Sequence, residues 1–252
     1  DGAGVGKGRQ LAGLIADQWA AGNRKHVWVS VSTDLKLDAE RDLADLGFGD
    51  DGGDDGAIGV ELLGKFAYGP IRGFDEGVMF ATYASLVGQK QHGGGARRKK
   101  AKKAHTRLDQ LLAWCAGAGG RADAFDGLVL FDESHKAKNL VSEAEAGGNG
   151  KGPPKKKSSK MAKTVEALQD QLPHARVVYC SATGASSLAN MAYMTRLGLW
   201  GRGTPFENFK KFEDSIGAGN NVGAMELVAL DIKRRGMYIS RQLSFKAASF
   251  NQ

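Results

Sequence analysis

The 252-residue chain is predicted to form an α/β fold with a doubly wound, mostly parallel sheet. Three observations predict it. Short apolar runs typical of buried strands alternate with segments whose apolar residues recur at helical spacing. A glycine-rich turn precedes the first helical segment, and a later apolar run ends in two carboxylates, Asp132 and Glu133. Parallel strands joined by right-handed crossovers bring such polar ends to one edge of the sheet.

The first half of the chain alternates helix and strand. A helix is expected after Lys7 and another between residues 30 and 47, since apolar residues recur at helical spacing in both. Strands are expected over residues 26–31 and 77–83. The apolar faces of the two helices are formed by Leu11, Leu14 and Ile15, and by Leu35, Ala39, Leu43 and Leu46.

The second half continues the pattern. A helix is expected around residues 108–115, a strand ending at Asp132, a helix over residues 161–172 stopped by Pro173, and a strand over residues 176–180. Two amphipathic segments then predict a helical C-terminal extension. In this extension an aromatic stripe is expected to dock within the chain, the alternative being a partner protein; it comprises Phe206, Phe209 and Phe212.

The opening DGAGVGKGR is suited to hold a phosphate chain. Its glycines permit positive-φ turns and let backbone N–H groups approach an anion, toward which the following helix aims its N-terminus. Lys7 would meet the β and γ phosphates. Gly8 stands where a Ser or Thr hydroxyl usually reaches Mg²⁺, so metal binding is expected to depend on the acidic strand end. The predicted nucleotide-binding residues are Gly2, Ala3, Gly4, Val5, Gly6, Lys7, Gly8 and Arg9.

The strand end DESH supplies the complementary groups. Asp132 is predicted to hold Mg²⁺, and Glu133 to orient or deprotonate the attacking water, which makes Glu133 and Lys7 the predicted catalytic residues. A third motif, Ser-Ala-Thr, follows another apolar run. Taken singly, these motifs could be ordinary turns and a solvated strand end, whereas their order along the chain is specific.

That order is the one found in helicase superfamily two, in which the Ser-Ala-Thr hydroxyls link the phosphate site to nucleic acid. The chain resembles, more closely, the Strawberry notch family of nuclear helicase-like proteins implicated in transcriptional regulation. The resemblance rests on DGAGVGKGRQLAGLI, WVSVSTDLKLDAERDL, DESHKAKN, ARVVYCSATGAS, NMAYMTRLGLWGRGTPF, GAMELVALDIK and GMYISRQLSF. Gly8 agrees with the family, whereas SLAN after SATGAS departs from an acidic-Pro-Arg-Asn turn.

The resemblance implies a RecA-like P-loop NTPase lobe over residues 1–200, with a family-specific helical extension over residues 201–252. ATP and Mg²⁺ are the implied cofactors. DNA or chromatin and transcription regulators are the implied partners, and the nucleus is the implied location. The implied coupling residues are Ser181, Ala182 and Thr183, and the implied nucleic-acid contacts are Ser32, Thr33 and Thr82.

Some of these residues have a simpler interpretation. Ser32 and Thr33 could instead cap the helix that follows them. Tyr83, at the end of the strand that also carries Thr82, is expected to lie in the core and not to contact nucleic acid.

The net charge of +7 is concentrated in two glycine-flanked segments. Seven Lys or Arg lie within residues 96–107 and five within residues 151–160, and the rest of the chain has 23 basic and 28 acidic residues. Both segments belong to predicted mobile insertions, near residues 90–107 and 146–160. The acidic segment at residues 47–57 is a third insertion, to which no function is assigned. The basic segments could grip phosphate backbones, act as nuclear-import signals, or be solvated loops without a partner.

Other features limit the function. No apolar run approaches the roughly 20 residues that a membrane-crossing helix needs, so no membrane partner is expected. Cys115 and Cys180 are expected to be free thiols of a reducing intracellular compartment. A strand normally leads into a P-loop, and by resemblance a second lobe supplies the hydrolytic arginine. We therefore expect this segment alone to bind nucleotide weakly and hydrolyse it poorly.

The leading hypothesis is the ATP-binding lobe of a Strawberry notch-type helicase-like protein that acts in chromatin-linked or DNA-linked regulation of transcription. One alternative is a catalytically weak regulatory scaffold that binds partner proteins. Another is a bacterial or phage-type DNA helicase domain. ATP hydrolysis that rises with DNA and is lost in Glu133→Gln would separate the motor from the scaffold.

Overall fold

A parallel five-stranded sheet forms the centre of the molecule. The computed structural model describes residues 6–49, 56–89, 106–137, 159–181, 191–217 and 222–241. Within them the strand order is β2-β3-β1-β4-β5, and every neighbouring pair is parallel. This confirms the predicted α/β class. The strands are β1 (Lys25–Ser30), β2 (Val60–Leu62), β3 (Gly77–Thr82), β4 (Leu128–Phe131) and β5 (Arg176–Tyr179).

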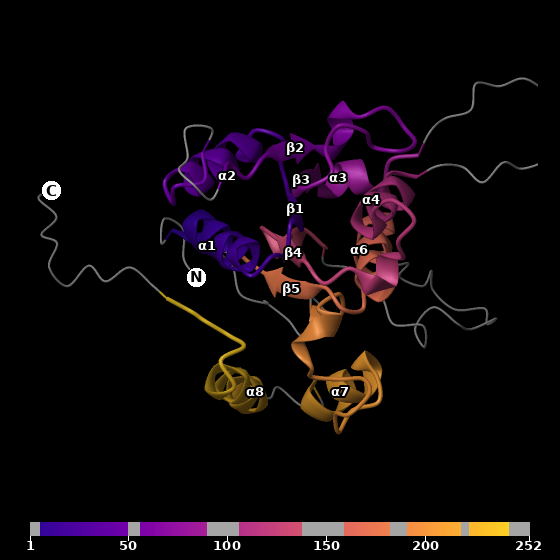
Figure 1. Cartoon of the computed structure of the whole chain (residues 1–252). Helices are drawn as coiled ribbons and strands as arrows, with labels where there is room; N and C mark the ends of the chain where they lie inside the picture. Colours follow the sequence, from indigo (N-terminus) through magenta and orange to yellow (C-terminus); the bar gives the residue numbers. More distant parts are fainter. Residues whose placement is uncertain are drawn as a thin grey trace, which may run out of the picture.

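Helices cover both faces of the sheet, as a doubly wound fold requires. Two of them, α1 (Lys7–Ala20) and α2 (Leu35–Ala44), lie on one face (Figure 1). The other face carries α3 (Tyr83–Leu86), α4 (Arg107–Ala116) and α6 (Lys160–Gln171). Each strand therefore ends between two helical layers, where its last residues can meet helix termini.

The central strands are apolar on both sides because both of their faces are covered. Along β1, Val27 and Val29 pack with the α3, α4 and α6 side, whereas Trp28 packs with α1 and α2. Two residues predicted on the apolar helix faces are not buried: Leu14 is 40% exposed and Leu46 is 38% exposed. The prediction was wrong for Leu46 because α2 ends at Ala44, before that side chain is reached.

Two short elements were not predicted. The strand β2 has only three residues, too few for an alternating pattern to be recognised. The helix α3 begins at Tyr83, so β3 ends one residue earlier than expected. Thr82 caps this helix: its Oγ1 accepts the Ser85 N–H at 3.0 Å, and the Thr82 N–H donates to Ser85 Oγ at 3.0 Å. Tyr83 is 2% exposed, which confirms its predicted place in the core.

The ends of the two basic segments belong to the folded core. Thr106 caps α4, and the Arg107 guanidinium donates to the carbonyls of Leu63 (3.3 Å) and Phe66 (2.8 Å). Ser159 caps α6 in the same way. The charge of Arg107 is therefore used in packing, whereas the other basic residues of the 90–107 segment lie outside the described residues.

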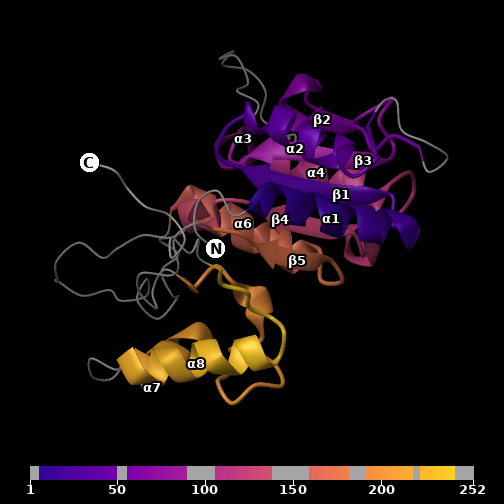
Figure 2. The ribbon, with the colours of Figure 1, turned by 90° about the vertical axis from the view of Figure 1, so that its left-hand side faces the viewer.

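The C-terminal extension forms a helical unit of its own beyond the β5 edge of the sheet (Figures 1 and 2). Its helices are α7 (Phe209–Gly217) and α8 (Val222–Arg234). The aromatic stripe packs around Trp200, whose ring lies 5.0 Å from Phe209 and 5.3 Å from Phe212 between centroids. Ile232 of α8 joins the same apolar cluster. The stripe thus docks within the chain, on this unit and not on the sheet.

Two expectations about chemistry can be compared with the described residues. Cys115 and Cys180 are both free cysteines, as predicted. Among the helices of the described ranges, none combines the length and apolar character that a membrane span requires.

Candidate nucleotide-binding site

A cleft of about 600 Å³ lies where the N-terminus of α1, one side of α2 and the carboxyl end of β4 meet. The residues that line it include Lys7, Gly8, Asp132 and Glu133, which come from two motifs more than 120 positions apart. The fold therefore brings the end of the glycine-rich motif, from Gly6 to Arg9, to the acidic strand end.

The N-terminus of α1 is open toward this cleft. Gly6 adopts a left-handed conformation (φ 78°, ψ 36°), which favours glycine, and the helix starts at Lys7. The first backbone amide that finds a helical acceptor is that of Gln10, which donates to Gly6 O at 3.2 Å. The amides before it point out of the helix end, where the helix dipole also favours an anion. The predicted residues Gly2, Ala3, Gly4 and Val5 lie outside the described residues.

Two hydrogen bonds orient the Asp132 carboxylate, and a third holds its backbone carbonyl. Ser30, the last residue of β1, donates from Oγ to Asp132 Oδ2 at 2.9 Å, and the Glu133 N–H donates to Oδ1 at 2.9 Å. The Tyr83 hydroxyl donates to the Asp132 carbonyl at 2.9 Å. Burial raises the pKa of the Asp132 carboxyl, an effect that the Ser30 hydrogen bond opposes. A cation bound at this carboxylate would offset the same cost of burial.

Glu133 has an unusual backbone conformation. Its φ of 47° makes it the one non-glycine residue with positive φ in the described ranges. A left-handed residue that is not glycine carries a strain of order 1–3 kcal/mol, and such strain concentrates at functional sites. The turn is fixed from the next residue onward, because the Ser134 N–H donates to Cys180 O at 2.8 Å. The residue that follows β5 thus holds the turn on which the Glu133 side chain stands.

A histidine links this carboxylate to the Ser-Ala-Thr motif. His135 Nδ1 lies 3.2 Å from Glu133 Oε2 and 2.9 Å from Ser181 Oγ. A single ring nitrogen makes one strong hydrogen bond at a time, so the imidazole can favour either oxygen. Sequence reasoning placed His135 in the DESH motif but gave it no role. It also missed Ser30 and Tyr83, which no motif marks. Ala182 and Thr183 lie outside the described residues.

The remaining predicted residues surround this centre. Arg9 is paired with Asp45, just beyond α2. Ser32 and Thr33 follow β1, and Thr82 ends the neighbouring strand β3. The alternative that Ser32 and Thr33 cap α2 is wrong: Asp34 is the N-cap residue, and no side chain caps that helix end. Contacts of these three residues with nucleic acid remain a prediction.

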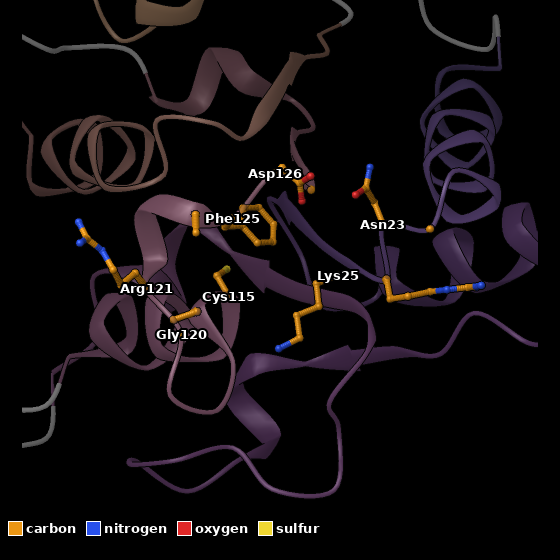
Figure 3. Close-up of a pocket in the computed structure, with 12 residues that line it drawn as sticks. Asn23, Lys25, Cys115, Gly120, Arg121, Phe125 and Asp126 are labelled. Carbon is orange, nitrogen blue, oxygen red and sulfur yellow. The ribbon is translucent and has the colours of Figure 1, made fainter.

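A smaller hollow of about 250 Å³ lies at the opposite end of the sheet, at the amino ends of β1 and β4 (Figure 3). Lys25 lies beside it, and its ammonium donates to Trp114 O at 2.8 Å. Asp126 also borders the hollow, and its carbonyl accepts from Arg176. The Lys25 and Arg176 side chains bind the protein's own backbone, and Arg121 pairs with Asp123, so we assign no ligand to this hollow.

The residues of the larger cleft fit a magnesium nucleotide. A helix N-terminus with a lysine suits phosphates, and one oriented carboxylate suits an octahedral ion that keeps phosphate oxygens and waters as its other ligands. The described residues hold no group of three or more His, Cys, Asp or Glu side chains that could enclose a metal. An ion shared between Asp132 and phosphate oxygens needs no such group. Fold and site together define a P-loop nucleoside triphosphate hydrolase.

Comparison with known proteins gives the same class. The family model described as P-loop containing NTP hydrolase pore-1 matches residues 1–252. The chain belongs to this family. The predicted similarity to Strawberry notch proteins is confirmed by the relatives that align with the chain. Together with the family model, they support a helicase-like domain.

Relatives from animals and a plant align along almost the whole chain. It is 49% identical to protein strawberry notch homolog 1 of Gallus gallus and 48% identical to protein strawberry notch of Drosophila melanogaster, each over 255 residues and 99% of the chain. It is 46% identical to protein FORGETTER 1 of Arabidopsis thaliana over 254 residues. The chain spans 18%, 14% and 17% of the length of these three proteins.

Proposed function

We propose that this chain is the ATP-binding lobe of a helicase-like protein of the Strawberry notch type, whose ATP hydrolysis is coupled to nucleic acid. One observation carries the proposal: the strand-end residues form a connected path from the phosphate cleft to the Ser-Ala-Thr motif. The path runs from Asp132 through Glu133 and His135 to Ser181. A phosphate site that is not coupled to nucleic acid would not need His135 and Ser181, the last two residues of this path.

In this proposal each residue has a defined task. Lys7 and the first-turn amides of α1 bind the phosphates. Asp132, oriented by Ser30, holds the Mg²⁺ ion, and Glu133 orients the attacking water and accepts its proton. Bound Mg²⁺ would neutralise charge on the β and γ phosphates. His135 would couple Ser181 to Glu133, because its Nδ1 lies within hydrogen-bonding distance of both and a movement of Ser181 would change its contact with Glu133.

The test is steady-state hydrolysis of ATP with and without DNA or RNA. It should be run on this chain and on a protein of the relatives' full length that contains it. We expect nucleic acid to raise the rate in the longer protein and Glu133→Gln to abolish the increase. A rate that nucleic acid leaves unchanged, in a protein that binds both ligands, would contradict the proposal.

We also propose a nuclear role in chromatin-linked regulation of transcription, with DNA and transcription regulators as partners. The support is the family resemblance and the twelve basic residues in two short segments. Replacing the lysines and arginines of residues 97–103 and 151–157 by glutamine should move a fluorescently labelled protein out of the nucleus and weaken DNA binding. If the nuclear localisation and the DNA affinity of this variant both equal those of the wild type, the basic segments do not support the proposal.

A regulatory scaffold remains the second candidate, and one observation favours it. Leu227 and Leu230 on α8 are 69% and 55% exposed, and Ile239 beyond the helix is 65% exposed. Exposed aliphatic side chains that follow one another in this way are typical of a surface that binds another protein. Transcriptional regulation that survives Glu133→Gln unchanged would favour the scaffold over the motor.

A further inference from the structure

The phosphate cleft lacks one group that P-loop proteins normally have. The residue after the P-loop lysine usually carries a hydroxyl that reaches Mg²⁺, and here it is Gly8. The structure shows what a side chain at this position would meet. A Cβ placed on Gly8 would lie closer to Asp42 Oδ2 than real Cβ atoms approach other atoms, and 3.5 Å from Asp42 Cγ. The carboxylate of Asp42 therefore fills the space that the missing side chain would take.

Asp42 is buried for a carboxylate. The residue is 7% exposed and its side chain 9% exposed, although it lies on α2 near the surface. Both hydrogen bonds that it accepts come from its neighbour Arg41, at 2.9 and 3.2 Å, and both reach Oδ1. In the described part of the chain no hydrogen bond reaches Oδ2, the oxygen beside Gly8.

The pairing with Arg41 does not account for this burial. The Arg41 side chain is 60% exposed, and ion pairs of that exposure contribute little. Asp42 Oδ2 is not among the fully buried side-chain atoms of the described residues that lack a partner, so this oxygen keeps access to solvent. Asp42 lines the same cleft as Lys7, Gly8 and Asp132. The cleft thus places an accessible carboxylate oxygen, which no donor of the described residues reaches, next to the helix end proposed to receive the phosphates.

We propose that Asp42 takes the metal-binding part that Gly8 cannot play, so that Oδ2 of Asp42 would help the carboxylate of Asp132 to hold the nucleotide's Mg²⁺. Asp42 is then a second acidic residue of the metal site, contributed by α2. The inference rests on the proposed nucleotide site and deepens it. It also changes the expectation that metal binding depends on the acidic strand end alone.

The test is the affinity for a fluorescent, non-hydrolysable ATP analogue, measured in Mg²⁺ and again in EDTA. Asp42→Asn keeps the shape but removes the charge. In Mg²⁺ its affinity should fall roughly tenfold, as when a metal ligand or its support is lost. In EDTA its affinity should rise by about threefold, because a negative charge beside the phosphates is gone. These opposite changes identify a metal ligand, since a purely structural defect would weaken binding in both conditions.

Asp38→Asn is the matched control. Asp38 lies one turn earlier on α2, lines the same cleft and also pairs with Arg41, but its side chain is 49% exposed. We expect its affinity to change less than twofold in either condition. An Asp38→Asn effect as large as that of Asp42→Asn would show a general effect of charge in the cleft and would overturn the proposal.

A rescue variant tests the geometry and covers the case in which Asp42→Asn fails to fold. Asp42→Ala empties the space beside Gly8, so that Gly8→Ser in the same chain can place a hydroxyl there. In the wild type, Mg²⁺ is expected to raise the affinity for the analogue, and Asp42→Ala should lose this increase. The double variant should recover at least half of it. Gly8→Ser alone should lose it, because its side chain meets Asp42. No rescue in a double variant that unfolds at the wild-type temperature would overturn the proposal.

The two levels of inference can fail separately. If the wild-type chain binds the analogue neither in Mg²⁺ nor in EDTA, or if Lys7→Ala leaves binding unchanged, the proposed nucleotide site is wrong. If the wild type binds and Lys7→Ala does not, but Asp42→Asn keeps the full gain from Mg²⁺, only the role of Asp42 is wrong.

Discussion

The two hollows at opposite ends of the sheet contain similar kinds of residue but differ in what those residues contact. At the amino end, Lys25 binds a backbone carbonyl and also lies 5.2 Å from the Trp114 ring centroid. At the carboxyl end, Asp42 keeps one oxygen without a donor among the described residues, and Glu133 has a strained backbone. Lys25 at the amino end is used by the fold, whereas Oδ2 of Asp42 at the carboxyl end accepts no hydrogen bond from the described residues.

This difference teaches that a hollow with charged walls is not by itself a binding site. What distinguishes the carboxyl end is the combination of an open helix terminus, an oriented carboxylate and backbone strain. The comparison predicts that substitutions at the carboxyl end change nucleotide chemistry and that matched substitutions at the amino end change stability.

The largest effect is expected for Glu133→Gln. The amide cannot accept a proton from water, so in the longer protein the rate of ATP hydrolysis should fall by at least about 100-fold while nucleotide affinity changes less than about threefold. Steady-state hydrolysis and analogue binding measure the two quantities. Asp126→Asn at the amino end is the control and should hydrolyse ATP at the wild-type rate. An equal loss of hydrolysis rate in Glu133→Gln and Asp126→Asn would contradict the assignment of the nucleotide site to the carboxyl end.

The next largest effect is expected for Lys7→Ala. A charged hydrogen bond contributes about 1.5–3 kcal/mol, so affinity for the ATP analogue should fall by roughly 10- to 100-fold. Lys25→Ala is the matched control. It should leave affinity unchanged and lower the free energy of unfolding by about 1–2 kcal/mol, because the bond to Trp114 O is lost. Urea unfolding and binding titrations separate the two results, and an affinity loss in Lys25→Ala would contradict the comparison.

The pH dependence of stability tests the amino end. Burial lowers the pKa of His26 to about 4, and its Nδ1 accepts the Leu128 N–H at 3.2 Å, which requires the neutral ring. The unfolded chain binds this proton near pH 6.5, so below that value protonation favours unfolding. The free energy of unfolding should fall by about 3 kcal/mol between pH 6.5 and 4.

The measurement is urea unfolding at several pH values without nucleotide. His26→Gln should lose most of this pH dependence, whereas His174→Gln, at an exposed position, should keep it. Identical slopes in the wild type and in His26→Gln would show that His26 does not govern acid stability.

The smallest effect is expected at the coupling residue. Ser181→Ala removes a hydroxyl 2.9 Å from His135 Nδ1, and one such hydrogen bond contributes about 1 kcal/mol. Stimulation of hydrolysis by nucleic acid should therefore drop by roughly fivefold in the longer protein. A ratio of stimulated to unstimulated rate equal to that of the wild type would separate Ser181 from the coupling path.

The parts of this account that depend on local pattern could be predicted from the sequence. The strand β4 is a continuous apolar run, β1 has an apolar centre at residues 27–29, and α1 follows a recognisable glycine-rich motif. The three-residue strand β2 could not be predicted, since it is shorter than the pattern used to recognise a strand. Two further features depend on where helices begin and end: the hydrogen bond of the Arg107 guanidinium to Phe66 O, and the exposure of the Leu46 side chain.

The candidate site was predictable in its motifs but not in its supporting residues. Lys7, Asp132 and Glu133 belong to ordered motifs with known chemistry. Asp42 has no motif, because its place beside Gly8 arises only when α2 packs on α1. Ser30 and Tyr83 likewise meet Asp132 through the pairing of strands and through the start of α3. Contacts between distant segments are the information that a single sequence does not display.

Hydrogen exchange with and without a non-hydrolysable ATP analogue and Mg²⁺ tests the central claim most directly, because it reports both ends of the sheet in one measurement. At saturating analogue, slower exchange is predicted for residues 6–10 and 132–135 and unchanged exchange for residues 22–25 and 120–127. Protection confined to the amino-end residues, or no protection at the carboxyl end despite measurable binding, would contradict the assignment of the nucleotide site.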